Sequence, residues 1–234
     1  MINNIILFIR ASIFWLIFIF STISLSLPLI VLRIFGYKAA FLVAKIWALI
    51  VIKTLQYVCG IKYELHGNFD IKNAFIFSKH QSTWETIFFL LVIPNPIFIV
   101  KRELMYIPFF GWCLFLLKNI SIDRASGRSA IKKMISETKK SIEQGFSVIL
   151  FPEGTRVDPG VQTMIKQGGI IMAKSLKIPI VPITHNAGEY WPKHSYAKYP
   201  GTIKILFGEP MRIEEKTSEE FKLEIENWMD QKIS

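Results

Sequence analysis

The feature that most constrains this chain is an uncharged stretch at residues 11–32, ASIFWLIFIFSTISLSLPLIVL, flanked by Arg10 and Arg33. As a helix that rises ~1.5 Å per residue, it is about long enough to cross the hydrocarbon core of a bilayer. A signal peptide is the alternative, although the stretch is longer than a usual signal-peptide core and no A-x-A-like cleavage site follows it. The stretch therefore predicts a membrane-associated helix near the N-terminus.

A second apolar stretch, residues 39–59, is interrupted by Lys45 and Lys53. Together with Lys38, these lysines recur at about two helical turns, which places them near one face of a helix. This pattern is typical of a helix that lies in the membrane interface with its lysines among the headgroups. The two stretches predict a pair of membrane-anchoring helices over residues 1–60, either as a hairpin in one leaflet or as a true span.

The charge of the chain is unevenly distributed. The net charge is +10, and residues 1–63 contain basic residues but no Asp or Glu. Such an excess attracts anionic lipids, acidic substrates or nucleic acid. The aromatic residues concentrate in apolar runs and do not alternate with Lys and Arg, which argues against nucleic acid as a partner. By the positive-inside rule, the basic residues after Leu32 favour a cytoplasmic position for the rest of the chain.

Several classes of site have no support in the sequence. The two cysteines, Cys59 and Cys113, form neither a CxxC pair nor a cluster with histidines, so we expect no metal site. Nothing in the sequence requires a disulfide, which fits a reducing compartment. The sequence also contains no P-loop, G-x-G-x-x-G, G-x-S-x-G or H-E-x-x-H motif. A nucleotide-phosphate loop, a serine-hydrolase turn and a zinc protease are therefore not predicted.

After the second apolar stretch, short apolar runs alternate with helical patterns. The candidate strands, rich in β-branched and aromatic residues, cover residues 74–78, 97–100, 146–151, 178–183 and 202–207. The candidate helices cover residues 82–92, 128–144, 162–176 and 217–232. This alternation predicts an α/β fold with a mostly parallel or mixed central sheet flanked by helices. We expect one α/β catalytic domain over residues 61–234.

Polar side chains follow three of the candidate strands. His80 and Glu85 follow the first, Lys101 and Arg102 follow the second, and the sequence PEGTR (152–156) follows the third. In an open α/β sheet, the loops at the carboxyl ends of neighbouring strands meet in one crevice. We therefore expect these residues, although distant in sequence, to form one site.

His80 and Glu85 are the first candidates for chemistry, because His80 lies just before a predicted helix and Glu85 just inside it. A carboxylate there can accept a hydrogen bond from one imidazole nitrogen, which fixes the tautomer and leaves the other nitrogen as a base. Two alternatives stay open on the residues alone. Ser82 and Glu85 match a capping box, so Glu85 could serve only the helix. A lone histidine beside an apolar strand is often structural.

The sequence FPEGTR (151–156) is the second candidate. Pro152 and Gly154 suit a tight turn, and backbone N–H groups together with Arg156 would form an anion site. The alternative is an ordinary turn with a solvated arginine. Further positive charge could come from four basic residues, although a single residue of this kind is more often a surface residue: Lys101, Arg102, Arg124 and Lys166.

Four segments occur in an order and spacing that resemble one known family: KHQSTWET, VKRELMYIPFFGW with ISIDR, FPEGTR and IPIVPI. The chain resembles the glycerolipid acyltransferases over roughly residues 60–210, and among them the bacterial 1-acylglycerol-3-phosphate O-acyltransferases. The resemblance implies transfer of a fatty acyl group from acyl-CoA or acyl carrier protein to the 2-hydroxyl of lysophosphatidic acid. The product would be phosphatidic acid, an intermediate of phospholipid biosynthesis. The resemblance implies no cofactor beyond the acyl donor.

The resemblance also implies roles for individual residues. His80, oriented by Glu85, would take the proton from the acceptor hydroxyl. The family pattern has Asp at the position of Glu85, which leaves open whether the longer side chain reaches the imidazole in the same way. The residues implied for acceptor binding are Glu153, Gly154 and Arg156, followed by Lys101, Arg124 and Lys166. Residues 104–117 would line an acyl tunnel, or would instead pack in the core or face the membrane.

The resemblance and the basic N-terminus together imply a protein at the cytoplasmic face of the bacterial inner membrane. Two other functions fit the same residues. One is a related acyltransferase for another acceptor, such as glycerol 3-phosphate, a lysophospholipid or a lyso-aminolipid; the basic residues favour an acceptor that carries a phosphate. The other is a non-catalytic lipid-binding protein of the membrane surface, against which the intact set of His80, Glu85 and Arg156 argues.

Overall fold

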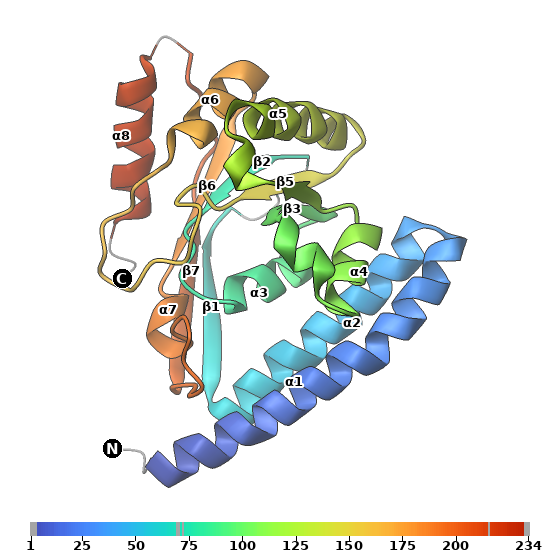
Figure 1. The fold of residues 1–234 in the computed structure, drawn as a ribbon. Helices are drawn as coiled ribbons and strands as arrows, with labels where there is room; N and C mark the ends of the chain where they lie inside the picture. Colours follow the sequence, from blue (N-terminus) through green and yellow to red (C-terminus); the bar gives the residue numbers. More distant parts are fainter. Residues whose placement is uncertain (1–3, 69–70, 72, 215, 232–234) are drawn as a thin grey trace.

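A computed structural model of the chain describes residues 4–68, 71, 73–214 and 216–231. Two N-terminal helices, α1 (Asn4–Leu32) and α2 (Tyr37–Thr54), form an antiparallel hairpin that lies along one side of the α/β part of the chain (Figure 1). Both are long and apolar enough to cross a membrane. The three lysines predicted to share one face of the second helix, Lys38, Lys45 and Lys53, are all exposed.

The outer helix α1 buries only a narrow stripe. Its buried residues recur at helical spacing and include Ala11, Phe14 and Leu29. In the most apolar 18 residues of this helix, only 17% are buried, whereas the corresponding fraction in the second helix is 39%. The reason is that α2 lies between α1 and the α/β part of the chain. Most of the apolar surface of α1 is therefore left free to contact lipid.

The central sheet has seven strands in the order β1-β7-β6-β2-β5-β3-β4. The strands are β1 (Ile61–Gly67), β2 (Phe75–Ser78), β3 (Pro96–Lys101), β4 (Ile120–Ile122), β5 (Ser147–Leu150), β6 (Ile180–His185) and β7 (Gly201–Phe207). Strands β6 and β7 pair antiparallel, and the other neighbouring pairs are parallel. The predicted fold class, a mixed sheet in an α/β fold, is confirmed.

Helices cover both faces of the sheet (Figure 1). Beyond the N-terminal pair they are α3 (Trp84–Val92), α4 (Phe110–Leu116), α5 (Arg128–Glu143), α6 (Gln167–Leu176), α7 (Ala187–Tyr190) and α8 (Ser218–Met229). Alternate residues of β2 point to opposite faces: Ile76 packs into the core shared with α2 and α3, whereas Phe75 and Phe77 pack into the core shared with α6 and α8. The sheet is therefore buried on both sides, as parallel strands require.

The differences from the predicted elements concern the edges, one helix start and one helix end. The edge strands β1 and β4 were not predicted, because β1 is largely polar and β4 has only three residues. The prediction that a helix begins at residue 162 is wrong, since α6 begins at Gln167. The backbone N–H groups of Thr163 and Ile165 donate instead to Asp230 and Glu226 of the C-terminal region. The prediction that the last helix continues to residue 232 is also wrong, since α8 ends at Met229 and the next two residues are not helical; residue 232 itself lies outside the described residues.

The N-terminal helices share a core with the sheet. Phe14 of α1 and Leu55, just after α2, are fully buried in the same apolar cluster as Trp191. Lys198 is fully buried beside them: its ammonium donates to the carbonyl oxygen of Tyr196 (2.8 Å) and lies 4.7 Å from the centroid of the Trp191 ring. Burial lowers the pKa of Lys198 to about 8. This contact fastens α1 to the α/β part; a domain boundary at residue 60 stays a prediction.

Candidate active site

The imidazole of His80 lies in the loop between β2 and α3 and forms a short hydrogen bond with Glu85. The distance from Nδ1 of His80 to Oε1 of Glu85 is 2.8 Å. The glutamate side chain is fully buried, whereas the histidine side chain is 17% exposed. Glu85 therefore reaches the imidazole despite the extra methylene relative to Asp, and the ring keeps an exposed edge for chemistry.

The same oxygen of Glu85 also holds the loop before α3, although the expected capping box of Ser82 and Glu85 is not what the structure has: the N-cap residue of α3 is Thr83. Oε1 accepts hydrogen bonds from the backbone N–H groups of Gln81 (3.1 Å) and Ser82 (2.9 Å). One oxygen of Glu85 therefore orients the imidazole and holds the loop. The other oxygen, Oε2, is buried and has no hydrogen-bond partner among the described residues.

The ionisation of Glu85 follows from these contacts. Burial acts to raise the pKa of Glu85, but the hydrogen bonds from the His80 imidazole and from the N–H group of Ser82 counter burial, and the pKa lies below its usual range. Glu85 is therefore an anion at neutral pH. An anion at Nδ1 favours the tautomer in which Nδ1 carries the proton, so Nε2 of His80 has the free lone pair.

A second histidine, His185 at the end of β6, supports this loop and was not predicted. Its Nε2 lies 2.8 Å from the carbonyl oxygen of Lys79, and its Nδ1 accepts a hydrogen bond from the N–H of Ala187 (3.3 Å). These partners require a neutral ring that is protonated at Nε2. Burial also lowers the pKa of His185. The only signal in the sequence was a histidine two residues after the apolar run 178–183.

The loop after β5, which contains FPEGTR, holds His80 on several sides. The Phe151 ring stacks on the imidazole, with centroids 4.0 Å apart and planes inclined by 17°. An oxygen of Glu153 accepts a hydrogen bond from the backbone N–H of His80 (3.2 Å), and the N–H of Val157 donates to the His80 carbonyl (2.8 Å). The histidine and the FPEGTR loop therefore form one unit, as the convergence of loops at this sheet edge predicts.

Glu153 lies behind this loop. It is almost completely buried, and burial raises the pKa of Glu153 to about 7. Its second oxygen, Oε2, is buried without a hydrogen-bond partner among the described residues. The carboxyl group is thus directed at the backbone of His80, and Glu153 is absent from the described residues that line the neighbouring cavity.

A cavity of about 620 Å³ lies beside His80 and brings together most of the predicted site residues. The predicted residues in its wall are His80, Lys101, Gly154, Arg156 and Lys166. Arg156 and Lys166 form no ion pair within the described part of the chain, and a Cβ atom added to Gly154 would lie 2.9 Å from the Lys166 ammonium. The glycine thus leaves room for a cation beside the base, an arrangement suited to a phosphate.

The basic candidates Lys101, Arg102 and Arg124 are less well placed than Arg156 and Lys166 to hold an anion in this cavity. Lys101 is half exposed at the cavity wall and pairs with Glu103 (3.2 Å). Arg102 pairs with Asp123 (3.1 Å) and stays exposed. Arg124 begins the turn Arg124–Ser126, and its side chain lies outside the described residues. In the described parts of the chain, no group of three or more His, Cys, Asp or Glu is placed to hold a metal ion.

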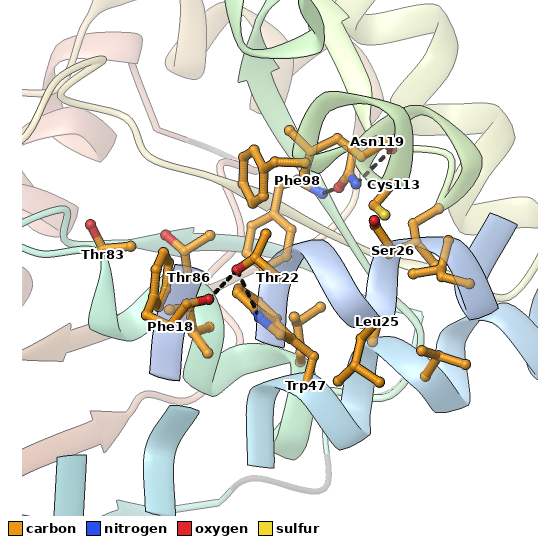
Figure 2. A pocket seen from close by; sticks show the side chains of 18 residues that line it. Phe18, Thr22, Leu25, Ser26, Trp47, Thr83, Thr86, Phe98, Cys113 and Asn119 are labelled. Carbon is orange, nitrogen blue, oxygen red and sulfur yellow. Dashed lines mark hydrogen bonds between the residues drawn. The ribbon is translucent and has the colours of Figure 1, made fainter. Parts of the chain in front are cut away.

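A second, almost entirely apolar cavity adjoins the first between the N-terminal helices, α3 and α4 (Figure 2). Both cavities are lined by Phe18, Thr83, Thr86, Phe98 and Phe110. Figure 2 shows how polar groups in this wall are satisfied: the indole N–H of Trp47 donates to Thr22 (3.1 Å), which donates to the Phe18 carbonyl (2.6 Å). With these polar groups paired, the largely apolar cavity offers a surface that suits a hydrocarbon chain.

Comparison with known proteins places this site in a family. The sequence model of the family described as "Acyltransferase" matches residues 61–186, which include His80, Glu85 and the FPEGTR loop. The chain belongs to the acyltransferase family. A 1-acyl-sn-glycerol-3-phosphate acyltransferase of Pseudomonas aeruginosa is 40% identical over 215 residues, which cover 88% of this chain and 82% of that protein. The predicted family is thereby confirmed.

More distant relatives carry similar names. A 1-acyl-sn-glycerol-3-phosphate acyltransferase of Cocos nucifera is 27% identical to this acyltransferase over 180 residues. The matched region covers 74% of this chain and 58% of the plant protein. The crystal structure of the 1-acyl-sn-glycerophosphate acyltransferase PlsC from Thermotoga maritima superimposes with a TM-score of 0.74 and covers 94% of both chains. The two sequences are 22% identical, so this likeness supports the fold.

Proposed function

We propose that this acyltransferase acylates the 2-hydroxyl of 1-acyl-sn-glycerol 3-phosphate (lysophosphatidic acid) with a fatty acyl group from acyl-CoA or acyl carrier protein. The names of its relatives support the acceptor. The observation that carries the proposal is the 2.8 Å bond from Nδ1 of His80 to the buried Glu85, at a cavity that also contains Arg156 and Lys166. A base and an anion site thus lie at the same cavity.

The chemistry follows from the tautomer of His80. Nδ1–H donates to Glu85, so Nε2 accepts the proton of the 2-hydroxyl as the hydroxyl oxygen attacks the thioester carbonyl carbon. The tetrahedral intermediate collapses with cleavage of the carbon–sulfur bond, and the imidazolium returns the proton to the leaving thiolate. The products are phosphatidic acid and a free thiol. The anionic Glu85 stabilises the imidazolium while it exists, and base catalysis of this kind contributes about 10²–10⁴-fold.

The basic side chains of the cavity would hold the acceptor phosphate. A phosphate monoester carries about −1.5 to −2 charges at neutral pH, as does a phosphoserine. Arg156 and Lys166 can neutralise this charge, since the described residues contain no carboxylate that pairs with either. We assign Lys101 a weaker contribution because it is half exposed and already paired with Glu103. The Glu153 carboxyl group supports the His80 backbone in this scheme.

The apolar cavity of Figure 2 would receive an acyl chain. It opens from the wall that contains Thr83 and Thr86, close to His80 in sequence and in the same cavity. The segment expected to line an acyl tunnel, residues 104–117, contributes Leu104 and Ile107 to the first cavity and Cys113, Leu114 and Leu117 to the second. Other residues of the segment, such as Tyr106 and Phe115, are exposed. The segment would therefore line the acyl tunnel with some side chains and face the membrane with others.

We also propose that the protein works at the cytoplasmic face of the bacterial inner membrane, with α1 and α2 lying in one leaflet. The packing of α2 against the α/β part supports this orientation, because a perpendicular span would draw the attached sheet towards the hydrocarbon. The basic residues after α1 support the cytoplasmic side. The reaction as proposed needs no cofactor other than the acyl donor.

An acceptor-and-donor panel tests the proposal. Purified protein in phospholipid vesicles is given lysophosphatidic acid, glycerol 3-phosphate, a lysophospholipid or a lyso-aminolipid, each with acyl-CoA and with acyl carrier protein. We expect phosphatidic acid and stoichiometric thiol release, with the highest kcat/KM for lysophosphatidic acid. Equal turnover of all acceptors would overturn the proposed acceptor, and lipid binding without turnover for any donor would overturn the enzymatic function.

A further inference from the structure

The segment between β3 and β4 exposes several large apolar side chains. The exposed fractions are 71% for Tyr106, 43% for Ile107, 47% for Trp112 and 73% for Phe115. We call these four residues the aromatic ledge. The Tyr106 hydroxyl and the Trp112 indole N–H form no hydrogen bond with another described residue. Exposed apolar side chains that gather in one place indicate an interaction surface, whereas single ones do not.

The aromatic ledge is continuous with the outer surface of α1. Ile30 of α1 lies together with Trp112 and Phe115 in the wall of an apolar groove between α1 and α4. The Arg33 side chain, just after α1, donates to the carbonyl oxygen of Leu116 at the end of α4 (3.0 Å). The ledge therefore extends the apolar surface that α1 already presents.

On the α1 side of the groove, this surface consists of residues spaced one helical turn apart. The residues one turn before and after Ile30, Leu27 and Ile34, are 56% and 83% exposed. Ile23, one further turn away, is 44% exposed. The stripe on α1 and the turn after it, together with the ledge residues of α4, Trp112 and Phe115, thus form a single apolar face built from two parts of the sequence.

The inner side of the same segment borders the catalytic cavity. Leu104, Ile107 and Phe110 line the cavity that contains His80. The backbone reverses sharply between Ile107 and α4: Phe109 has a φ of 63°, and the N–H of Phe110 donates to the Pro108 carbonyl (2.7 Å). One short segment thus separates the catalytic cavity from the apolar face.

We propose that the aromatic ledge is a second membrane-contacting element, immersed in the same leaflet as α1. Its continuity with α1 identifies the occupant as a lipid bilayer. The composition of the ledge agrees, because Tyr and Trp with free polar tips are enriched where hydrocarbon meets headgroups. Basic residues at the adjoining end of the hairpin and of α4, Arg33, Lys38 and Lys118, match anionic headgroups.

Quenching of Trp112 by lipids brominated on the acyl chain tests this contact. Wild-type protein and the Trp112→Phe variant are bound to vesicles of phosphatidylglycerol and phosphatidylethanolamine, and the difference between their emissions isolates Trp112. We expect brominated lipid to quench most of this difference and aqueous acrylamide to quench little of it. Trp228→Phe is the control: it removes a half-buried tryptophan of α8 and should leave the lipid-quenched emission unchanged.

A binding measurement supplies the second arm. Phe115→Ser should weaken partition into the same vesicles about tenfold, the scale expected when one large apolar side chain no longer leaves water. Leu223→Ser, at a 56% exposed leucine of α8, should not. Acrylamide quenching of Trp112 that vesicles do not reduce would overturn the proposal, as would a dimer dissociated by Phe115→Ser. No substrate is present, so failure here leaves the proposed reaction untouched.

Discussion

The exchange Glu85→Gln separates the two tasks of the Glu85 carboxylate. A glutamine can keep an oxygen at the position of Oε1, where it still accepts from His80 and from the N–H groups of Gln81 and Ser82. The hydrogen bonds and the tautomer of His80 are then retained, while the negative charge is lost. Any loss of kcat therefore reports stabilisation of the imidazolium by the charge.

The structure sets the size of the effect. Unit charges about 4 Å apart interact by roughly 4 kcal/mol at an effective dielectric constant of about 20. Since about 1.4 kcal/mol is tenfold in rate, kcat should fall by about 10²–10⁴-fold with little change in KM. The new amide NH₂ would occupy the position of Oε2, which has no partner among the described residues. Two unpaired donors there should cost about 1–3 kcal/mol of stability each.

The assay is steady-state thiol release with lysophosphatidic acid, together with thermal unfolding followed by circular dichroism. We expect a folded protein with a lowered Tm and a strongly reduced kcat. Glu85→Asp, which restores the charge on a shorter side chain, should recover part of the lost rate. A folded Glu85→Gln variant with wild-type kcat would refute stabilisation of the imidazolium by the negative charge and leave Glu85 only as a hydrogen-bond acceptor for His80 and the loop.

Three further predictions concern the phosphate site, the acyl cavity and Glu153. Arg156→Met, which keeps an apolar stem without charge, should raise KM for lysophosphatidic acid by about 10–100-fold, because a charge-assisted bond contributes roughly 1.5–3 kcal/mol; an unchanged KM would contradict the phosphate role. Ala44→Phe, in the wall of the apolar cavity, should shift the preferred acyl chain to shorter lengths in a donor series, and an unaltered profile would exclude that cavity. Burial raises the pKa of Glu153 to about 7 in the folded state, whereas the unfolded state loses this proton near pH 4.5. Between these pH values the folded state binds more protons than the unfolded state, so the free energy of unfolding falls as pH rises from about 4.5 to 7. The Tm of Glu153→Gln relative to wild type should therefore increase over this range, and a difference independent of pH would contradict the buried, titrating carboxyl group.

The local sequence predicts the central part of the fold well. Strands β2, β3, β5, β6 and β7 are short apolar runs among helical patterns, so the alternation of patterns identifies them. The sequence does not predict the edge strand β1, because only Ile61 in it is fully buried and most of its other residues are polar. The start of α6 escapes for another reason: the side chains that take the N–H groups of Thr163 and Ile165 come from α8 and its end, more than sixty residues later.

The candidate site shows the same division. The pairing of His80 with Glu85 could be predicted because both partners lie within one turn of a helix start. The support from His185 could not, since its bond to Lys79 depends on how β6 and β2 lie side by side in the sheet. The sequence also did not predict that the Glu153 side chain points towards the backbone of His80, because the backbone geometry after β5 sets that orientation. Sequence spacing therefore predicts contacts between residues a few positions apart, whereas contacts between distant residues depend on how the strands pack.

The central claim, that His80 is the base of an acyl transfer to lysophosphatidic acid, is tested most directly by the rate of phosphatidic acid formation in His80→Ala. The control is His194→Ala, which alters an exposed histidine. The structure predicts a folded His80→Ala protein whose kcat is lower by at least about 10²-fold, and a His194→Ala protein with wild-type kcat. Phosphatidic acid formation by folded His80→Ala at the wild-type rate would contradict the account.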